Sequence, residues 1–286
     1  MTLRVSVVVP TCGRPQLLAR CIAALESQSL PEHDYEVIVV EDGGRRGPAS
    51  ARNRGWRLAS APIVAFTDDD CVPDRDWLRN GLAAMESADA VTGRIIMPIP
   101  DRPTDYERDA KGLERAEFVT ANCFCRKFVL EKLGGFDERF RLAWREDSDL
   151  HFRLLEGGYR VRSEGSAVVV HPVRPARWGV SVSQQRKVMF DALLFKKHRE
   201  LYRRRIRSAP RWDYYAIVLS LMLSVYHPAF LIAWVALTLR FAWQRLRGTS
   251  HSLRHIVEML VTSMLIPPVS VFWRIVGAWR FKVAFA

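Results

Sequence analysis

The sequence lacks several features that mark particular classes of protein. It has five cysteines in 286 residues, and they form no paired disulfide framework. The spacing of Cys123 and Cys125 is not that of a common zinc site, which favours ordinary reduced thiols over a redox or metal pair. We see no charged region followed by a long apolar core at the amino terminus, so we expect no secretory signal. Together these absences indicate a reducing, cytosolic environment.

The first two thirds of the chain also lack an excess of basic charge, although the formal net charge is +12. Residues 1–185 hold 26 Lys and Arg against 27 Asp and Glu, whereas residues 186–211 hold 10 against 2 and residues 212–286 hold 7 against 2. An enzyme of nucleic acids would spread basic charge over its folded domain, so we expect no nucleic-acid partner. Basic residues beside apolar segments instead indicate an anionic membrane surface.

No internal repeat or low-complexity segment interrupts the first 170 residues, where short β-rich runs alternate with helical patterns about every 25 residues. We predict strands at 4–9, 35–40, 62–67 and 166–171, and helices from Pro15, over 49–59, up to Gly134-Gly135, and from 145 to Gly157-Gly158. This alternation is typical of an α/β fold with a doubly wound, mostly parallel sheet. Ligands of such sheets bind at the carboxyl ends of the strands, where Thr11, Asp42 and the triplet Asp68–Asp70 fall.

The last part of the chain contains two long apolar segments. Tyr214–Leu239 has no charged residue, and Ile256–Trp273 has only Glu258. Spanning a bilayer takes about 20 apolar residues, so two transmembrane helices are one interpretation. His227-Pro228 and Pro267-Pro268 interrupt the segments near their middles, and basic residues flank both. We therefore favour re-entrant hairpins that keep every basic flank on the cytosolic face.

Three adjacent carboxylates repel one another, so the triplet Asp68–Asp70 needs a positive partner unless it is a solvated turn. The surrounding segments indicate which positive partner to expect. In chain order they read VVVPTCGRP, VIVVEDGG, SARNRG, FTDDDCVP, GGFDE, WREDSDL and VVVH. Their order and approximate spacing, over about residues 4–172, resemble the family 2 glycosyltransferases of GT-A fold.

The resemblance implies a nucleotide-diphosphate sugar as donor, commonly UDP-linked, and a divalent cation, Mn²⁺ or Mg²⁺, as the counter-ion of the triplet. Such a cation neutralises the departing diphosphate as a Lewis acid. Asp68 and Asp70 match the two acidic positions of the family's D-x-D motif. Asp70 would bind the metal, Asp68 the metal or the ribose, and His171 matches a further metal ligand of some relatives.

The same resemblance assigns the remaining candidate residues. Asp42 would recognise the nucleobase, commonly uracil. Other residues would contact the base, ribose or phosphates: Pro10, Thr11, Arg14, Arg52 and Asp69. Asp147 matches the general base of an inverting transfer, with Glu146 and Trp144 beside the acceptor. Each also has a structural alternative as a turn residue, surface arginine, helix-start carboxylate, core aromatic or satisfied histidine.

The implied organisation is a catalytic domain at 1–180, a basic juxtamembrane region at 181–211 and membrane-associated helices at 212–286. Processive members carry Q-x-x-R-W, whereas Gln184–Val188 has Lys and Val in place of the Arg and Trp, which favours single addition. We expect a lipid-linked or membrane-proximal acceptor, with the catalytic domain on the cytoplasmic side of the cell membrane. Three alternatives remain: a polyprenyl-phosphate sugar transferase, a two-metal phosphodiesterase, and a non-catalytic module that binds sugar nucleotides.

Overall fold

The computed structural model describes residues 3–43 and 46–285. It divides into two compact units. Unit 1 comprises Met1–Pro98 and Lys111–Val173, and unit 2 comprises Ile99–Ala110 and Arg174–Ala286. The sequence placed one boundary near residue 180. In the structure, the boundary follows Val173, and residues 99–110 also belong to the second unit.

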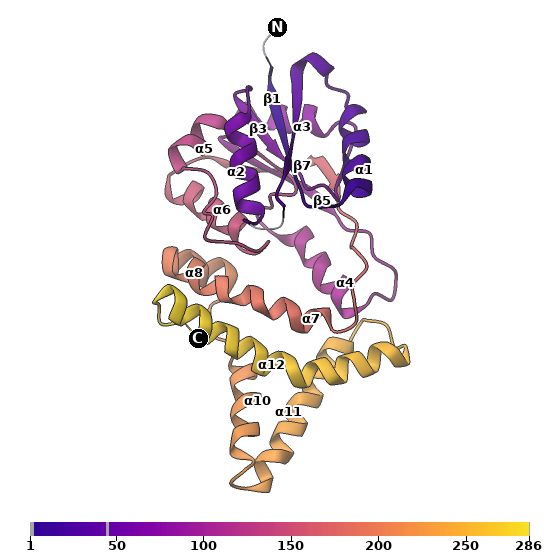
Figure 1. Cartoon of the computed structure of the whole chain (residues 1–286), viewed down its shortest axis with the longest axis vertical. Coiled ribbons are helices and arrows are strands. Elements are labelled where there is room, and N and C mark those ends of the chain that lie inside the picture. Colours follow the sequence, from indigo (N-terminus) through magenta and orange to yellow (C-terminus); the bar gives the residue numbers. More distant parts are fainter. Residues whose placement is uncertain (1–2, 44–45, 286) are drawn as a thin grey trace. The chain divides into compact units, whose positions relative to one another are not determined.

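Unit 1 is an α/β layer structure (Figure 1). Its strands are β1 (Val5–Thr11), β2 (Tyr35–Glu41), β3 (Ile63–Phe66), β4 (Val72–Pro73), β5 (Ala90–Ile96), β6 (Cys123–Arg126) and β7 (Val161–Val170). Its helices are α1 (Pro15–Glu26), α2 (Pro48–Leu58), α3 (Trp77–Met85), α5 (Lys127–Leu133) and α6 (Glu146–Glu156), with 3-10 turns η1 (Glu32–Asp34) and η2 (Lys111–Arg115). Every strand and helix predicted for this part of the chain is present. The prediction did not include β4, β5, β6 and α3.

The sheet has the strand order β2-β1-β3-β6-β5-β7-β4. Strand β1 pairs in parallel with β2 and β3, and β5 pairs in parallel with β7. Strand β6 runs antiparallel between β3 and β5, and β4 is antiparallel to β7. The sheet is therefore mixed, and five strands share one direction. The carboxyl ends of β1, β2, β3, β5 and β7 consequently lie along the same edge.

Strand β6 explains how both faces of the sheet are covered. Successive side chains of a strand point to opposite faces. Cys123 and Cys125 join the cluster that includes Trp56 of α2, whereas the Phe124 ring lies 5.0 Å from that of Trp77 of α3. A Cβ on Gly81 would lie 2.1 Å from Phe124 Cζ, so only glycine lets α3 approach this closely. The two cysteines are buried, free core residues.

Unit 2 is helical. Its elements are α4 (Asp105–Ala110), α7 (Val180–Ser183), 3-10 helix η3 (Gln184–Val188), α8 (Met189–Lys197), α9 (Arg199–Leu201), π-helical turn η4 (Tyr202–Ile206), α10 (Trp212–Leu223), α11 (Pro228–Leu246) and α12 (Leu253–Phe281). The first apolar segment breaks at His227-Pro228, and α10 and α11 form a helical hairpin there (Figure 1). His227 Nδ1 accepts a hydrogen bond from Ala229 N at 3.2 Å and caps α11. The reversal of the chain expected at His227-Pro228 is therefore present, and the entry of this hairpin into the membrane stays a prediction.

The second apolar segment differs from the prediction. Helix α12 runs for 29 residues through Pro267 and Pro268 without reversing, so the hairpin expected there is wrong. A proline inside a helix costs about 3 kcal/mol. Here Ile266 and Pro267 are buried, and α12 packs on α8, α10 and α11. This packing offsets the local cost and keeps the helix continuous.

The helices of unit 2 bury polar side chains and expose apolar ones. Arg245 is 6% exposed, and its guanidinium lies 2.8 Å from Asp105 Oδ2 and 2.7 Å from Thr262 Oγ1. By contrast, large apolar side chains are exposed on all three long helices: Leu219, Met222, Phe230, Leu231, Ile232, Val235, Leu239, Val257, Leu260, Met264, Phe272, Ile275 and Trp279. Two helices, α11 and α12, are long and apolar enough to cross a membrane.

Candidate active site

Most of the predicted site residues gather at the carboxyl edge of the unit 1 sheet. Thr11 ends β1, the triplet Asp68–Asp70 follows β3, and His171 follows β7. The end of β1 is hydrogen-bonded to the residue that follows β2, since Asp42 N donates to Thr11 O at 2.8 Å. The predicted turn behind Asp42 includes Gly44, which lies outside the described residues. Glu146 and Asp147 form the first turn of α6.

Two arginines balance much of the charge of the acidic triplet. Arg14 lies 2.8 Å from Asp69 and 3.7 Å from Asp70, and Arg52 lies 2.7 Å from Asp68. Asp69 is fully buried and also accepts from the Thr11 hydroxyl at 2.7 Å. Burial raises the pKa of Asp69 despite these partners. The sequence predicted both arginines as contacts of the sugar-nucleotide donor but did not predict their ion pairs with the triplet.

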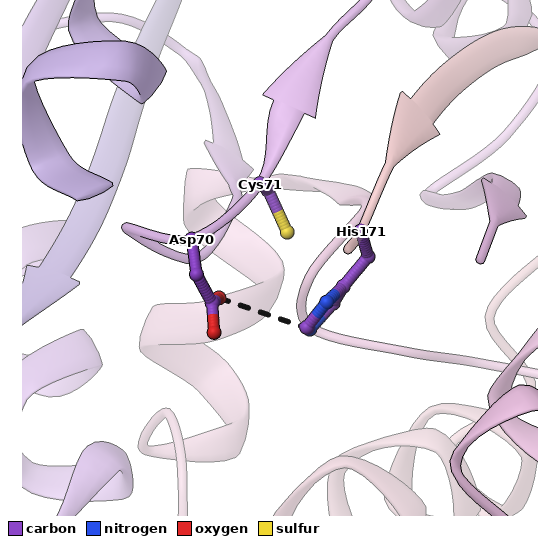
Figure 2. Close-up of side chains that lie close together, drawn as sticks. All are labelled: Asp70, Cys71 and His171. Carbon is purple, nitrogen blue, oxygen red and sulfur yellow. Dashed lines mark ion pairs between the residues drawn. The ribbon is translucent and has the colours of Figure 1, made fainter. Parts of the chain in front are cut away.

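Asp70 lies beside two further possible metal ligands, Cys71 and His171. Figure 2 shows Asp70, Cys71 and His171 together, and one ligand atom from each lies within 4.8 Å of the others. His171 Nε2 is 3.8 Å from Asp70 Oδ1, while its buried Nδ1 has no hydrogen-bond partner among the described residues. The carboxylate and the imidazole fit a divalent cation such as Mn²⁺, whereas the thiol is a softer ligand that favours ions such as Zn²⁺ or Co²⁺. Asp68, predicted to bind the metal or the ribose, is paired with Arg52 in the structure.

Cys71 was not predicted as part of this group. The signal for Cys71 in the sequence was its place directly behind the triplet. Its closeness to His171 arises in the structure, where β4 pairs with β7, the strand that leads to His171. The thiol is buried, and burial, together with the charges of Asp68 and Asp70, raises its pKa well above the ordinary value. Without a cation, Cys71 is therefore a neutral thiol.

The two carboxylates at the start of α6 are both harder to ionise than usual. Burial, reinforced by the charge of Asp147, raises the pKa of Glu146 to about 7. Burial also raises the pKa of Asp147, whose Oδ1 accepts from Ser148 N at 2.6 Å. The residue before them, Arg145, has φ of 75°, which is unusual for a residue with a side chain. A carboxylate with a raised pKa is a better proton acceptor at neutral pH.

Arg52 connects the acidic triplet to the start of α6. Its side chain is 4% exposed and donates to Asp68 Oδ1 at 2.7 Å and to Glu146 Oε1 at 3.2 Å. Both acceptors hold the guanidinium in its charged form, which raises the pKa of Arg52 further. Residues 52, 68 and 146 therefore share one buried ion-pair network in unit 1.

The other predicted residues line the same edge with fewer contacts. Asp42 Oδ2 accepts from Gly47 N at 3.2 Å, while its buried Oδ1 has no hydrogen-bond partner among the described residues. This Oδ1 lies 4.0 Å from the Arg54 guanidinium, too far for a hydrogen bond, so it can accept one from an N–H donor of a ligand. Pro10 is a buried residue of β1, and Trp144 is 36% exposed beneath the Arg145 guanidinium, 4.5 Å from its ring centre.

Comparison with known proteins supports the predicted family and the predicted fold. Residues 6–45 and 43–141 match the family model described as glycosyl transferase family 2. This match supports a family 2 glycosyltransferase. The matched residues include the acidic triplet and both arginines, whereas Glu146, Asp147 and His171 lie beyond them.

Individual relatives agree with this assignment. The chain is 27% identical over 209 residues to glycosyltransferase AglE of Haloferax volcanii, with 60% of this chain and 67% of that protein covered. It is 30% identical over 210 residues to the pre-mycofactocin glycosyltransferase of Mycobacterium tuberculosis, with 59% and 43% covered. The chain thus spans less than half the length of the second relative.

Solved structures of two glycosyltransferases resemble the fold described here. TarS of S. aureus in complex with UDP superposes with a TM-score of 0.50 and 15% identity, covering 91% of this chain and 90% of that one. Mannosyltransferase PcManGT of Pyrobaculum calidifontis, in complex with GDP-Man and Mn²⁺, gives a TM-score of 0.54 and 18% identity, covering 98% and 88%. At these identities the likeness concerns the fold. It confirms the predicted fold class, a sheet with flanking helices.

Proposed function

We propose that the chain is an inverting glycosyltransferase that moves one sugar from a nucleotide-diphosphate sugar to an acceptor hydroxyl. The observation that carries this proposal is the Arg52 bridge, which joins Asp68 of the triplet to Glu146, the neighbour of Asp147. A donor-binding carboxylate cluster and a candidate base thereby belong to one site. Family membership and the sugar nucleotides named for the two solved relatives support the same reaction.

Each residue has a defined task in this proposal. Asp147 accepts the proton of the acceptor hydroxyl as its oxygen bonds to the anomeric carbon and the bond from that carbon to the diphosphate breaks. Asp70 and His171, with Cys71 adjacent, would hold Mn²⁺ or Mg²⁺, which supplies Lewis-acid stabilisation of the diphosphate when bound. Asp42 Oδ1, which has no hydrogen-bond partner among the described residues, accepts from a base N–H, and we take that base to be uracil.

Asp147→Asn tests the base. The change keeps the shape of the side chain but removes its proton affinity, so we expect transfer to fall by about 10²–10⁴-fold. Binding of UDP, measured as a rise in melting temperature, should be retained. Asp137→Asn, at a carboxylate outside the Arg52 network, is the matched control. Wild-type turnover by Asp147→Asn would assign the base to another carboxylate, and a larger stabilisation by GDP than by UDP would contradict uracil.

We also propose that unit 2 attaches the enzyme to the cytoplasmic face of the cell membrane, next to a lipid-linked or membrane-proximal acceptor. The exposed apolar side chains of α10, α11 and α12 support this placement, because water would disfavour so large an apolar surface. Helix α10 has 12 residues, about 18 Å at 1.5 Å per residue, against a hydrocarbon core of about 30 Å. The α10–α11 hairpin therefore enters one leaflet and returns.

Cysteine labelling tests the hairpin. Cys12 is the exposed cysteine and the other four are buried, so Cys12→Ser is the background. His251→Cys, in the exposed loop before α12, and Tyr226→Cys, at the hairpin tip, are then treated in intact cells with a membrane-impermeant thiol reagent. We expect labelling of position 251 only after lysis. Labelling of either position from outside the cell would establish a membrane crossing and contradict the hairpin.

A further inference from the structure

A tight turn behind β3 brings a thiol into the group of possible metal ligands. One ligand atom from each of Asp70, Cys71 and His171 lies within 4.8 Å of the others, and Figure 2 shows the Cys71 sulfur pointing into the space between the other two side chains. Neighbouring residues of an extended strand would point to opposite faces. Here the chain turns instead, because Cys71 N donates to Asp68 O at 3.0 Å. The carboxylate and the thiol can therefore reach the same ion.

The pairing of β4 with β7 brings the imidazole to the thiol. The antiparallel register joins Val72 to Val170. Continued by one residue, this register puts Cys71 opposite His171, and directly opposed residues have Cβ atoms about 4.5–5.5 Å apart. On its other side, His171 N donates to Ile96 O of β5 at 2.8 Å. The sheet therefore fixes the position of the imidazole beside the thiol.

The imidazole has hydrogen-bonding capacity that the described residues do not satisfy. The buried His171 Nδ1 has no hydrogen-bond partner among them, and Asp70 Oδ1 lies 3.8 Å from Nε2, beyond hydrogen-bond distance. Buried polar atoms nearly always have a partner, so this ring is suited to a ligand. Four cysteines are buried and free, but among the described residues only Cys71 shares such a group with a carboxylate and an imidazole.

The chemical nature of the three ligands distinguishes one divalent cation from another. Mg²⁺ and Mn²⁺ prefer oxygen ligands, whereas thiolate and imidazole together favour Zn²⁺. Zinc accepts sulfur at about 2.3 Å and nitrogen or oxygen at about 2.0 Å, in a tetrahedron whose N and O ligands lie about 3.3 Å apart. The 3.8 Å between His171 Nε2 and Asp70 Oδ1 is close to that separation. A small movement of either side chain would complete the geometry.

We infer that Cys71 is a metal ligand and that this site binds Zn²⁺ in preference to Mn²⁺, through the Asp70 carboxylate, the Cys71 thiolate and the His171 imidazole. On binding, the thiol proton passes to solvent and the sulfur bonds to the ion. The inference rests on the metal role proposed for Asp70 and His171, and it makes that role specific. Zn²⁺ and Mn²⁺ compete for this site, because both use the same carboxylate and imidazole.

Metal binding to the purified full-length protein tests the inference without any measure of transfer. All variants carry Cys12→Ser, which removes the exposed thiol. Zn²⁺ affinity is measured by competition with a chromophoric chelator, and Mn²⁺ affinity by loss of the electron paramagnetic resonance signal of the free ion. We expect Zn²⁺ to bind more tightly than Mn²⁺ and to displace it. X-ray absorption of the equimolar zinc complex should show one sulfur at about 2.3 Å.

Cys71→Ser should remove that sulfur from the zinc spectrum. Its Zn²⁺ affinity should fall at least about tenfold, since even the outer-shell partners of metal ligands contribute 10–100-fold in affinity. Its Mn²⁺ affinity should change by less than about threefold, because a thiol adds little to the binding of a hard ion. Cys125→Ser is the matched control, because it makes the same change at a buried free thiol of β6.

Four results would overturn the inference: tighter binding of Mn²⁺ than of Zn²⁺, a wild-type zinc spectrum without sulfur, full Zn²⁺ affinity in Cys71→Ser, or an equal loss in Cys125→Ser. If circular dichroism shows that Cys71→Ser does not fold, the wild-type spectrum decides together with His171→Gln, which should also weaken Zn²⁺ binding. Sugar transfer is assayed separately. A protein that binds Zn²⁺ through sulfur but transfers no sugar would contradict the proposed reaction and leave this site standing.

Discussion

Glu146 provides a test of the electrostatics at the start of α6. Its pKa is raised from 4.5 to about 7, and burial is the largest cause. The folded protein therefore holds the proton more tightly than the unfolded chain does. Stability should fall as pH rises from about 4.5 to about 7 and stay constant above that range. Each pKa unit corresponds to 1.36 kcal/mol, so the ionised carboxylate costs about 3 kcal/mol above pH 7.

Glu146→Gln removes this cost, because glutamine resembles the protonated acid and never ionises. We expect the variant to match the wild type near pH 4.5 and to exceed it by about 3 kcal/mol near pH 8. For a protein of this size that corresponds to a rise of about 6–12 °C in melting temperature. Glu131→Gln, at an exposed position of α5, is the matched control and should show no such pH dependence.

The assay should report on unit 1 alone. All five cysteines lie in unit 1, and four of them are buried, so their reactivity in a short thiol-labelling pulse measures the unfolding of that unit. Samples are equilibrated in urea at each pH and pulsed at one fixed pH. A stability difference that does not change with pH would refute the reasoning. A Glu146→Gln variant that is less stable near pH 8 would show that the pair with Arg52 outweighs desolvation.

Three further predictions follow from the same unit. Arg52→Met leaves Asp68 and Glu146 without their shared cation and should lower the free energy of unfolding, measured in urea, by about 3–5 kcal/mol. The control Arg57→Met, at an exposed position, should change it little, and equal effects would contradict the network. Gly81→Ala should destabilise unit 1 by about 1–3 kcal/mol because its methyl meets Phe124, and a stabilised variant would refute that contact. Adding Co²⁺ to the wild type should produce a thiolate-to-metal charge-transfer band, which Cys71→Ser should abolish. Asp70→Ala should weaken Co²⁺ binding itself, and a band that persists in Cys71→Ser would exclude the thiol as a ligand.

The sequence alone determined the elements whose signals are local. Short runs rich in β-branched residues identified β1, β2 and β3, and the glycine pairs located the ends of α5 and α6. These patterns need only neighbouring residues, so no tertiary information was required. The order of the motifs likewise indicated the family, because each motif consists of a few neighbouring residues and their order can be taken directly from the sequence. The break at His227-Pro228 was also local, since proline removes a backbone donor there.

Tertiary structure decided what depends on partners far apart in the chain. Strand β6 turns antiparallel between β3 and β5, and no short-range pattern specifies a strand's direction. Arg52 meets Glu146 across 94 residues, so the bridge between the triplet and α6 appears only in the fold. Helix α12 continues through Pro267 because its buried residues pack on three other helices, which outweighs the local preference for a break. Local propensities amount to a few kcal/mol per element, and packing changes the outcome wherever it contributes more.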